Sequence, residues 1–97
     1  MKEYLIRPVD ADFFAIPPDE WRDVLRPTSL ASQIIEGGGN LRLKVLGAEI
    51  AFYDEMDGIH VCFEKGEISE VAANQIVEEI RQRLVEATKE EARAVPL

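Results

Sequence analysis

The sequence predicts an α+β fold in which an antiparallel meander of three to four strands packs one face against a long C-terminal helix. The middle of the chain alternates apolar and polar residues, as a half-buried strand does. The last third instead places apolar residues at three- and four-residue steps, as one stripe of a helix does. A length of 97 residues fits a single domain. We expect four parts: an N-terminal arm with a short helix over residues 1–27, the sheet over 28–66, the helix over 67–92 and a frayed tail over 93–97.

The N-terminal arm is expected to be irregular. Residues 4–7 have the composition of a short strand. In the segment IPPDEWRDVL that follows, a proline suits the first turn of a short helix, three acidic residues suit its positive end, and Pro27 stops it. This helix would turn Trp21, Val24 and Leu25 toward the core.

Two strands are expected on either side of a run of three glycines. The first covers about residues 30–35, and the glycines at 37–39 supply a flexible turn. The second is LRLKV, in which Leu41, Leu43 and Val45 alternate with basic residues and therefore share the buried face.

A hairpin follows, with strands over residues 49–53 and 59–64 joined by the loop EMDG. We expect Gly58 to supply a left-handed conformation in a four-residue loop. A tighter Asp57-Gly58 turn would pair Asp54 with Val61. The carboxylate would then lie on the apolar face of the sheet, so the longer loop is preferred. Its register sets Phe52 opposite Val61, Ile50 opposite Phe63, Tyr53 opposite His60 and Ala51 opposite Cys62.

The C-terminal helix is predicted from Val71 to about Ala92, with Ser69 as its N-cap. Two exposed ion pairs are expected along it, because the partners lie three or four residues apart. These pairs are Glu78 with Arg81 and Glu79 with Arg83. The tail beyond Glu90 is charged, lacks an apolar stripe and includes Pro96, so it is expected to fray.

The charge balance indicates which partners this chain suits. The net charge is −8, and residues 49–97 carry five basic and twelve acidic side chains. Nucleic acids and anionic membranes are bound through clustered Lys and Arg, so both are excluded as expected partners. In the N-terminal stretch MKEYLIRPVDADFF, charged residues interrupt every apolar run, so we expect neither a signal peptide nor a membrane span there. A single cysteine points to a reducing compartment, for which the cytoplasm is the default.

The stretch FYDEMDGIHVCFEKG holds the only histidine and the only cysteine, His60 and Cys62. A Cys/His nucleophile needs the sulfur within hydrogen-bond reach of the ring and nearby donors for an oxyanion. Residues two apart on a strand begin about 7 Å apart, and an open sheet offers no obvious pocket. We therefore assign no catalytic residue and expect a protein that is not an enzyme.

Metal binding is the second chemistry considered for this hairpin. His60, Cys62 and Glu64 alternate on one face, with Glu49 close to Glu64. Zinc sites normally draw three or four ligands from well-spaced pairs, and this chain offers only one His and one Cys. A calcium loop over residues 53–64 would begin at Tyr53, which has no carboxylate. We assign no metal ligand and no cofactor.

In size, acidity and the order of sheet followed by helix, the stretch GAEIAFYDEMDGIHVCFEKGEISEVAANQIVEEI resembles small immunity proteins of bacterial polymorphic toxin systems. The resemblance covers about the last half of the chain and carries over no motif residue. It implies inhibition of a cognate toxin by direct binding.

Two functions follow from these features. The first is a small acidic, non-enzymatic protein-binding module that masks a basic surface on a partner, as an immunity or inhibitor-type protein does. Its expected binding residues are Glu49, Tyr53, Asp54, Glu55, Asp57, His60 and Glu64. The alternative is a self-associating structural or accessory protein, a homodimer, and an enzyme remains only if dimerisation builds the missing pocket. The expected dimer interface consists of Phe13, Phe14, Trp21, Ala51, Tyr53 and Cys62.

Overall fold

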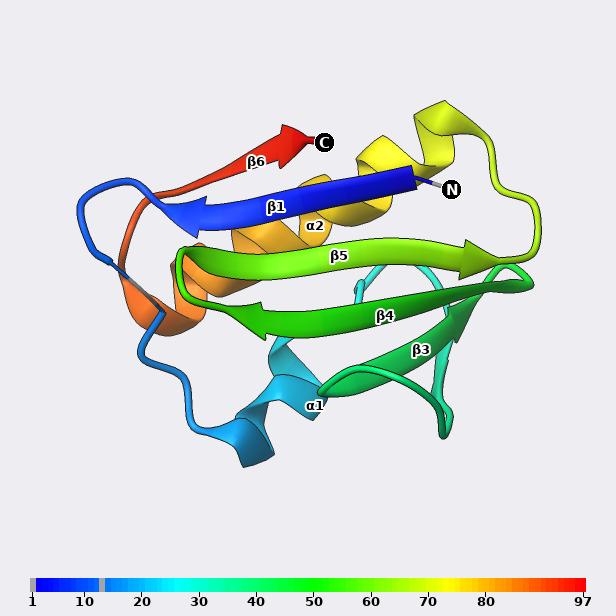
Figure 1. Ribbon diagram of the computed structural model, residues 1–97, viewed down its shortest axis with the longest axis horizontal. Helices are drawn as coiled ribbons and strands as arrows, with labels where there is room; N and C mark the ends of the chain where they lie inside the picture. The colour runs from blue at the N-terminus through cyan, green and yellow to red at the C-terminus, as the bar shows by residue number, and fades with distance from the viewer. Residues whose placement is uncertain (1, 13) are drawn as a thin grey trace.

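A computed structural model describes residues 2–12 and 14–97 and contains a mixed α+β fold with one antiparallel sheet (Figure 1). The sheet has six strands, so the predicted three to four were too few, and its order is β2-β3-β4-β5-β1-β6. The long helix α2 covers one face (Figure 1). The elements in chain order are β1 (Lys2–Pro8), the 3-10 helix η1 (Pro18–Glu20), α1 (Trp21–Val24), β2 (Ser32–Ile34), β3 (Leu41–Val45), β4 (Ala48–Glu55), β5 (Gly58–Lys65), α2 (Glu70–Thr88) and β6 (Ala92–Pro96).

The predicted meander is present as β2 to β5, in which each strand pairs with the next in the chain. The two additional strands come from the ends of the sequence. β1 pairs with β5, and β6 pairs with β1 at the sheet edge. The first residues are therefore not an irregular arm, because Tyr4 and Ile6 are buried on the face that α2 covers.

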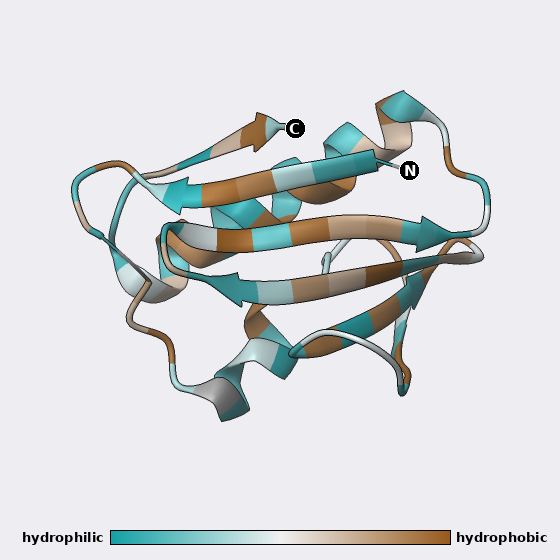
Figure 2. Cartoon of the chain, in the orientation of Figure 1, coloured by the Kyte–Doolittle hydropathy of each residue, from teal (hydrophilic) through white to brown (hydrophobic). Residues whose placement is uncertain are grey.

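The core lies between the sheet and the helices. Alternate residues of β1, β3, β4 and β5 point into it, and brown and teal segments alternate along β3 (Figure 2). The helix α2 contributes its apolar stripe, as the three- and four-residue spacing predicts. Trp21 and Leu25 are buried and Val24 is half-buried, which confirms the predicted inward face of the short helix. The buried residues of α2 are Ala73, Ile76, Val77, Ile80 and Leu84.

The register of the β4–β5 hairpin is the predicted one, with Phe52 opposite Val61 and Ile50 opposite Phe63. The strands continue further than expected, since Glu55 pairs with Gly58 and only Met56 and Asp57 form the turn. Gly58 has a φ of +155°, which is not the left-handed turn conformation predicted for it. A glycine is needed there because a Cβ atom would lie 2.2 Å from the carbonyl oxygen of Ile6 on β1.

The helix α2 begins as predicted and ends earlier. The Ser69 hydroxyl accepts a hydrogen bond from the backbone N–H of Ala72, which is an N-cap. The helix stops at Thr88 rather than at Ala92, because Lys89 adopts a left-handed conformation and its N–H bonds to the carbonyl of Val85. Residues 92–96 form β6, so the predicted frayed tail is wrong.

Polar contacts tie the segment after α1 to the helix α2. Glu79 accepts hydrogen bonds from the hydroxyl and N–H of Ser29 and from the hydroxyl of Thr28, whereas Arg83 donates to the carbonyl of Arg26. The predicted Glu79–Arg83 pair is therefore wrong. The Glu78–Arg81 pair is confirmed, with a shortest N–O distance of 2.6 Å. Among the described residues, no helix is both long and apolar enough to cross a membrane.

Candidate functional site

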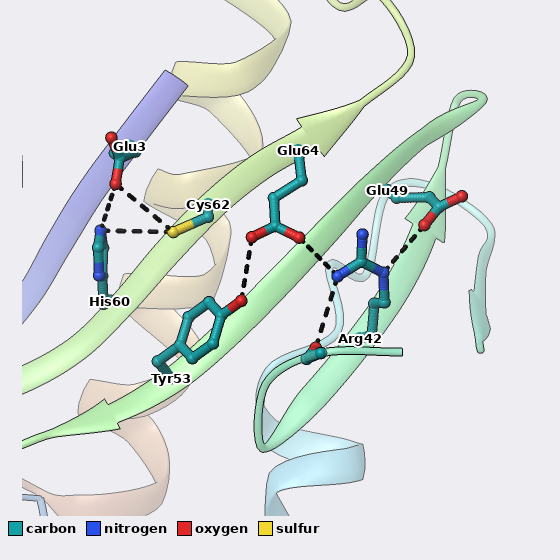
Figure 3. A network of polar contacts seen from close by, with 8 residues as sticks. Glu3, Arg42, Glu49, Tyr53, His60, Cys62 and Glu64 are labelled. Atoms are coloured by element: carbon teal, nitrogen blue, oxygen red, sulfur yellow. Dashed lines mark hydrogen bonds and ion pairs between the residues drawn. The ribbon is translucent and has the colours of Figure 1, made fainter. Parts of the chain in front are cut away.

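The face of the sheet that α2 does not cover carries the polar cluster drawn in Figure 3. One row of directly paired residues crosses it from β3 to β1, through Arg42, Ala51, Cys62 and Glu3. Successive side chains of a strand point to opposite faces of the sheet. A residue two positions along the strand from a member of this row therefore lies on the same face as the row. His60, Tyr53 and Glu64 lie beside the row in this way (Figure 3).

Arg42 is the centre of the first half of this cluster. Its Nε donates to Oε1 of Glu49 at 2.9 Å, and its Nη1 donates to Oε1 of Glu64 at 2.6 Å. Oε2 of Glu64 accepts a third bond, 3.0 Å long, from the Tyr53 hydroxyl. The Arg42 side chain is only 7% exposed, and two carboxylates balance its charge.

The pKa of Glu64 lies below its ordinary value, mainly because Arg42 donates a hydrogen bond to its carboxylate and also because Tyr53 does so. Glu64 reaches the arginine from an irregular position, where the register of β4 and β5 shifts between Glu49 and Ile50. Such an irregularity changes the direction of nearby side chains. Glu49 and Glu64, both expected to bind a basic partner, each accept a hydrogen bond from Arg42 of their own chain.

The second half of the cluster brings His60 and Cys62 together. The Cys62 Sγ lies 3.4 Å from Nε2 of His60, so these side chains converge although their residues are two positions apart on the strand. Glu3 of β1 completes the group, with its Oε1 2.9 Å from the same Nε2 and 3.8 Å from Sγ. The other ring nitrogen, Nδ1, lies 3.3 Å from Oε1 of Glu55.

The thiol in this group is a poor nucleophile as it stands. Burial, and next the negative charge of Glu3, raise the pKa of Cys62 to about 11. Reactive cysteines have lowered pKa values, because the thiolate is the attacking species. The contact between Cys62 and His60 therefore does not by itself make a nucleophilic pair. Three atoms of types that can bind a metal ion nevertheless lie within 4.8 Å of one another. They are the Cys62 sulfur, an imidazole nitrogen of His60 and a carboxylate oxygen of Glu3.

The tip of the β4–β5 hairpin is a separate acidic region. Asp54, Glu55 and Asp57 are exposed, and Met56 between them is 95% exposed. Within residues 2–12 and 14–97, no ion pair joins these three carboxylates to a Lys or Arg. A hollow of about 520 Å³ beside the tip is lined by Asp12, Phe14, Asp54, Glu55 and Met56. We refer to these five residues together with Asp57 as the acidic tip.

The residues expected at a dimer interface are not gathered on one exposed patch. Trp21 is part of the core, while Ala51 and Cys62 are 0% and 4% exposed within one chain. Phe14 and Tyr53 are half-buried. Phe13 lies outside the described residues. The homodimer remains a prediction, with little apolar surface from this set available to support it.

Sequence reasoning missed Glu3, Arg42 and Met56 as members of these regions. The alternation of apolar and basic residues in LRLKV correctly placed Arg42 on the face away from the core, and this was the available indication that it could join the polar cluster there. Glu3 lies 59 residues from Cys62 in the sequence, so only the pairing of β1 with β5 brings them together. No protein-family model, curated protein or solved structure matches this chain.

Proposed function

We propose that this chain is a small, non-enzymatic protein-binding module that uses its acidic tip to mask a basic surface on another protein. The observation that carries the proposal is the exposed Met56 surrounded by Asp54, Glu55 and Asp57, next to the hollow that Phe14 lines. Asp54 and Asp57 join no ion pair among the described residues and Glu55 contacts only His60, whereas Glu49 and Glu64 are held by Arg42.

The arrangement suits a binding site in which the charged residues speed association and an apolar residue makes the close contact. Carboxylates around the tip accelerate encounter with a basic patch, because opposite charges attract at a distance before the surfaces meet. Met56 can then fill an irregular apolar gap on the partner, since its side chain is flexible and polarisable. The overall charge of −8 strengthens the same attraction and favours solubility.

An immunity or inhibitor-type protein is one form of this function, in which the masked surface belongs to a toxin or enzyme. A binding role also agrees with the chemistry of Cys62, since a pKa of about 11 keeps the thiol protonated near neutral pH. The free cysteine further favours the cytoplasm as the compartment.

The test is affinity capture from the native lysate by the wild-type chain and by the variant Asp54→Asn, Glu55→Gln, Asp57→Asn. The wild type is expected to capture a stoichiometric basic protein at low salt and less of it at physiological salt, because salt screens exposed charges. The triple variant should capture little of it at either salt.

A matched control carries Glu36→Gln, Glu67→Gln and Glu86→Gln, three exposed carboxylates that do not line the hollow at the tip. It has the same net charge as the tip variant, so a specific site predicts that it still captures the partner. Equal losses in both variants would mean that total charge, rather than the acidic tip, attracts the protein. A chain that captures no partner and forms a dimer stable in salt would favour the self-associating alternative.

A further inference from the structure

The atoms of Glu3, His60 and Cys62 are placed as three ligands of a tetrahedral metal ion. In a zinc site the metal lies about 2.3 Å from sulfur and about 2.0–2.1 Å from nitrogen or oxygen. Tetrahedral angles then put sulfur about 3.6 Å from both nitrogen and oxygen, and nitrogen about 3.3 Å from oxygen. The corresponding distances here are 3.4, 2.9 and 3.8 Å. Shifts of a few tenths of an ångström would therefore complete the geometry.

The backbone already fixes these three residues relative to one another. Glu3 and Cys62 are directly paired across β1 and β5, and His60 lies on the same face of β5, two positions away. Both strands lie inside the sheet, with neighbours on each side. A site built on paired interior strands keeps its ligands in place better than one built on a loop.

The second nitrogen of the histidine has the partner that a metal-bound imidazole needs. Nε2 faces Glu3 and Cys62, whereas Nδ1 lies 3.3 Å from Oε1 of Glu55. A proton on Nδ1, donated to Glu55, leaves the lone pair of Nε2 free for the metal. Histidine ligands of zinc commonly make such an outer hydrogen bond to a carboxylate.

We propose that Glu3, His60 and Cys62 bind a zinc ion, with Glu55 orienting the histidine and a water molecule in the fourth position. The sulfur ligand selects against Mg²⁺ and Ca²⁺, which prefer oxygen. Zinc takes the place of the thiol proton, which passes to solvent, so two negative ligands balance the charge of the ion. The water can enter from the outer face of the sheet, which α2 leaves uncovered (Figure 3).

The test is a titration of tag-free, chelator-treated full-length chain with Co²⁺, followed by competition with Zn²⁺. We expect one Co²⁺ per chain, a thiolate-to-cobalt charge-transfer band, the visible bands of tetrahedral cobalt, and loss of all of them when Zn²⁺ is added. Zinc should also raise the melting temperature of the wild type, because it binds the folded state.

Variants separate the roles of the four residues. Cys62→Ser should abolish the charge-transfer band, and Glu3→Gln or His60→Asn should abolish tight binding. Glu55→Gln should keep the spectrum and weaken binding by about 10-fold, as loss of an outer hydrogen bond does. Glu67→Gln, an exposed carboxylate after β5, should change nothing.

Circular dichroism is used to check that each variant is folded. The titration of the wild-type protein is decisive even without the variants. Folded wild-type protein that gives no charge-transfer band would overturn the proposal. So would a stoichiometry other than one per chain, or a band of unchanged affinity in Glu3→Gln. The capture experiment measures binding of another protein, whereas the cobalt titration measures metal binding by the isolated wild-type chain, so failure of either proposal can be recognised independently of the other.

Discussion

Arg42 joins two strands of the outer face by bonding to Glu49 of β4 and to Glu64 of β5. The arginine is nearly buried, while each glutamate side chain is 25% exposed, so water still reaches the carboxylates. An arginine can serve both because its planar guanidinium carries several donors in fixed directions. A lysine in this place could not bond to both glutamates with the same geometry.

The lowered pKa of Glu64 makes a prediction about stability in acid. A carboxylate whose pKa is lower in the folded chain stabilises the fold above its unfolded-state pKa of about 4.3, and this contribution disappears as the pH falls through the folded-state value. Glu64→Gln should therefore lower the free energy of unfolding near neutral pH by less than about 1 kcal/mol, because solvent screens the pair. The difference should narrow below about pH 4.3.

Urea unfolding at a series of pH values measures this difference. Glu67→Gln provides the control, since that side chain is exposed and joins no described ion pair. A difference between wild type and Glu64→Gln that widens in acid would contradict the account of the Arg42 cluster.

Glu55 connects the two regions described above. Its carboxylate lines the hollow at the acidic tip and also contacts Nδ1 of His60. The hairpin places it at the last pair before the turn, opposite Gly58. A substitution of Glu55 can therefore affect both partner binding and metal binding.

At the scale of elements, the packing of β1 against β5 depends on the absence of a side chain at Gly58. A Cβ atom there would lie 2.2 Å from the carbonyl oxygen of Ile6 and 3.1 Å from Cα of Arg7. We predict that Gly58→Ala lowers the free energy of unfolding by about 2–4 kcal/mol, because the backbone of β1 must move.

Gly47→Ala is the matched comparison for this effect. Gly47 also has a positive φ, +79°, but a Cβ atom there would meet nothing within 4 Å. Its cost should be only that of the left-handed conformation, about 1–2 kcal/mol. Equal losses of stability in the two variants, measured by urea unfolding, would mean that close approach of β1 is not the reason for glycine at position 58.

The elements that the sequence predicted well are those with a clear period. The hairpin register follows from keeping Ile50, Phe52, Val61 and Phe63 on one face, and a shift of one residue would expose all of them. The stripe of α2 and its Ser69 cap were predictable for the same kind of reason.

The missed strands lack such a signal. β6 reads ARAVP, in which two alanines supply the inward positions, and alanine is uncommon in strands. Lys89 ends α2 in a left-handed conformation that is usually taken by glycine, so the residue at this position does not predict the end of a helix. The Glu3–His60–Cys62 group depends on β1, and pairing between strands so distant in sequence cannot be inferred from local periodicity.

At the scale of the whole molecule, the ends of the chain complete a sheet that the middle begins. β2 to β5 form the continuous meander, and the first strand then lies between β5 and the last strand (Figure 1). This arrangement puts the segment after β1, with Asp12 and Phe14, beside the β4–β5 turn. The acidic tip is thus assembled from two distant parts of the chain, and it lies at one end of the sheet (Figure 1).

Hydrogen exchange of this chain, alone and bound to the captured basic partner, would show which surface binds. If the acidic tip is the binding surface, binding slows exchange at the backbone amides of residues 54–57, 12 and 14, and leaves exchange in α2 and at the β2 edge unchanged. Slower exchange confined to α2 or the β2 edge, with the acidic tip unchanged, would contradict the assignment of the tip as the binding surface.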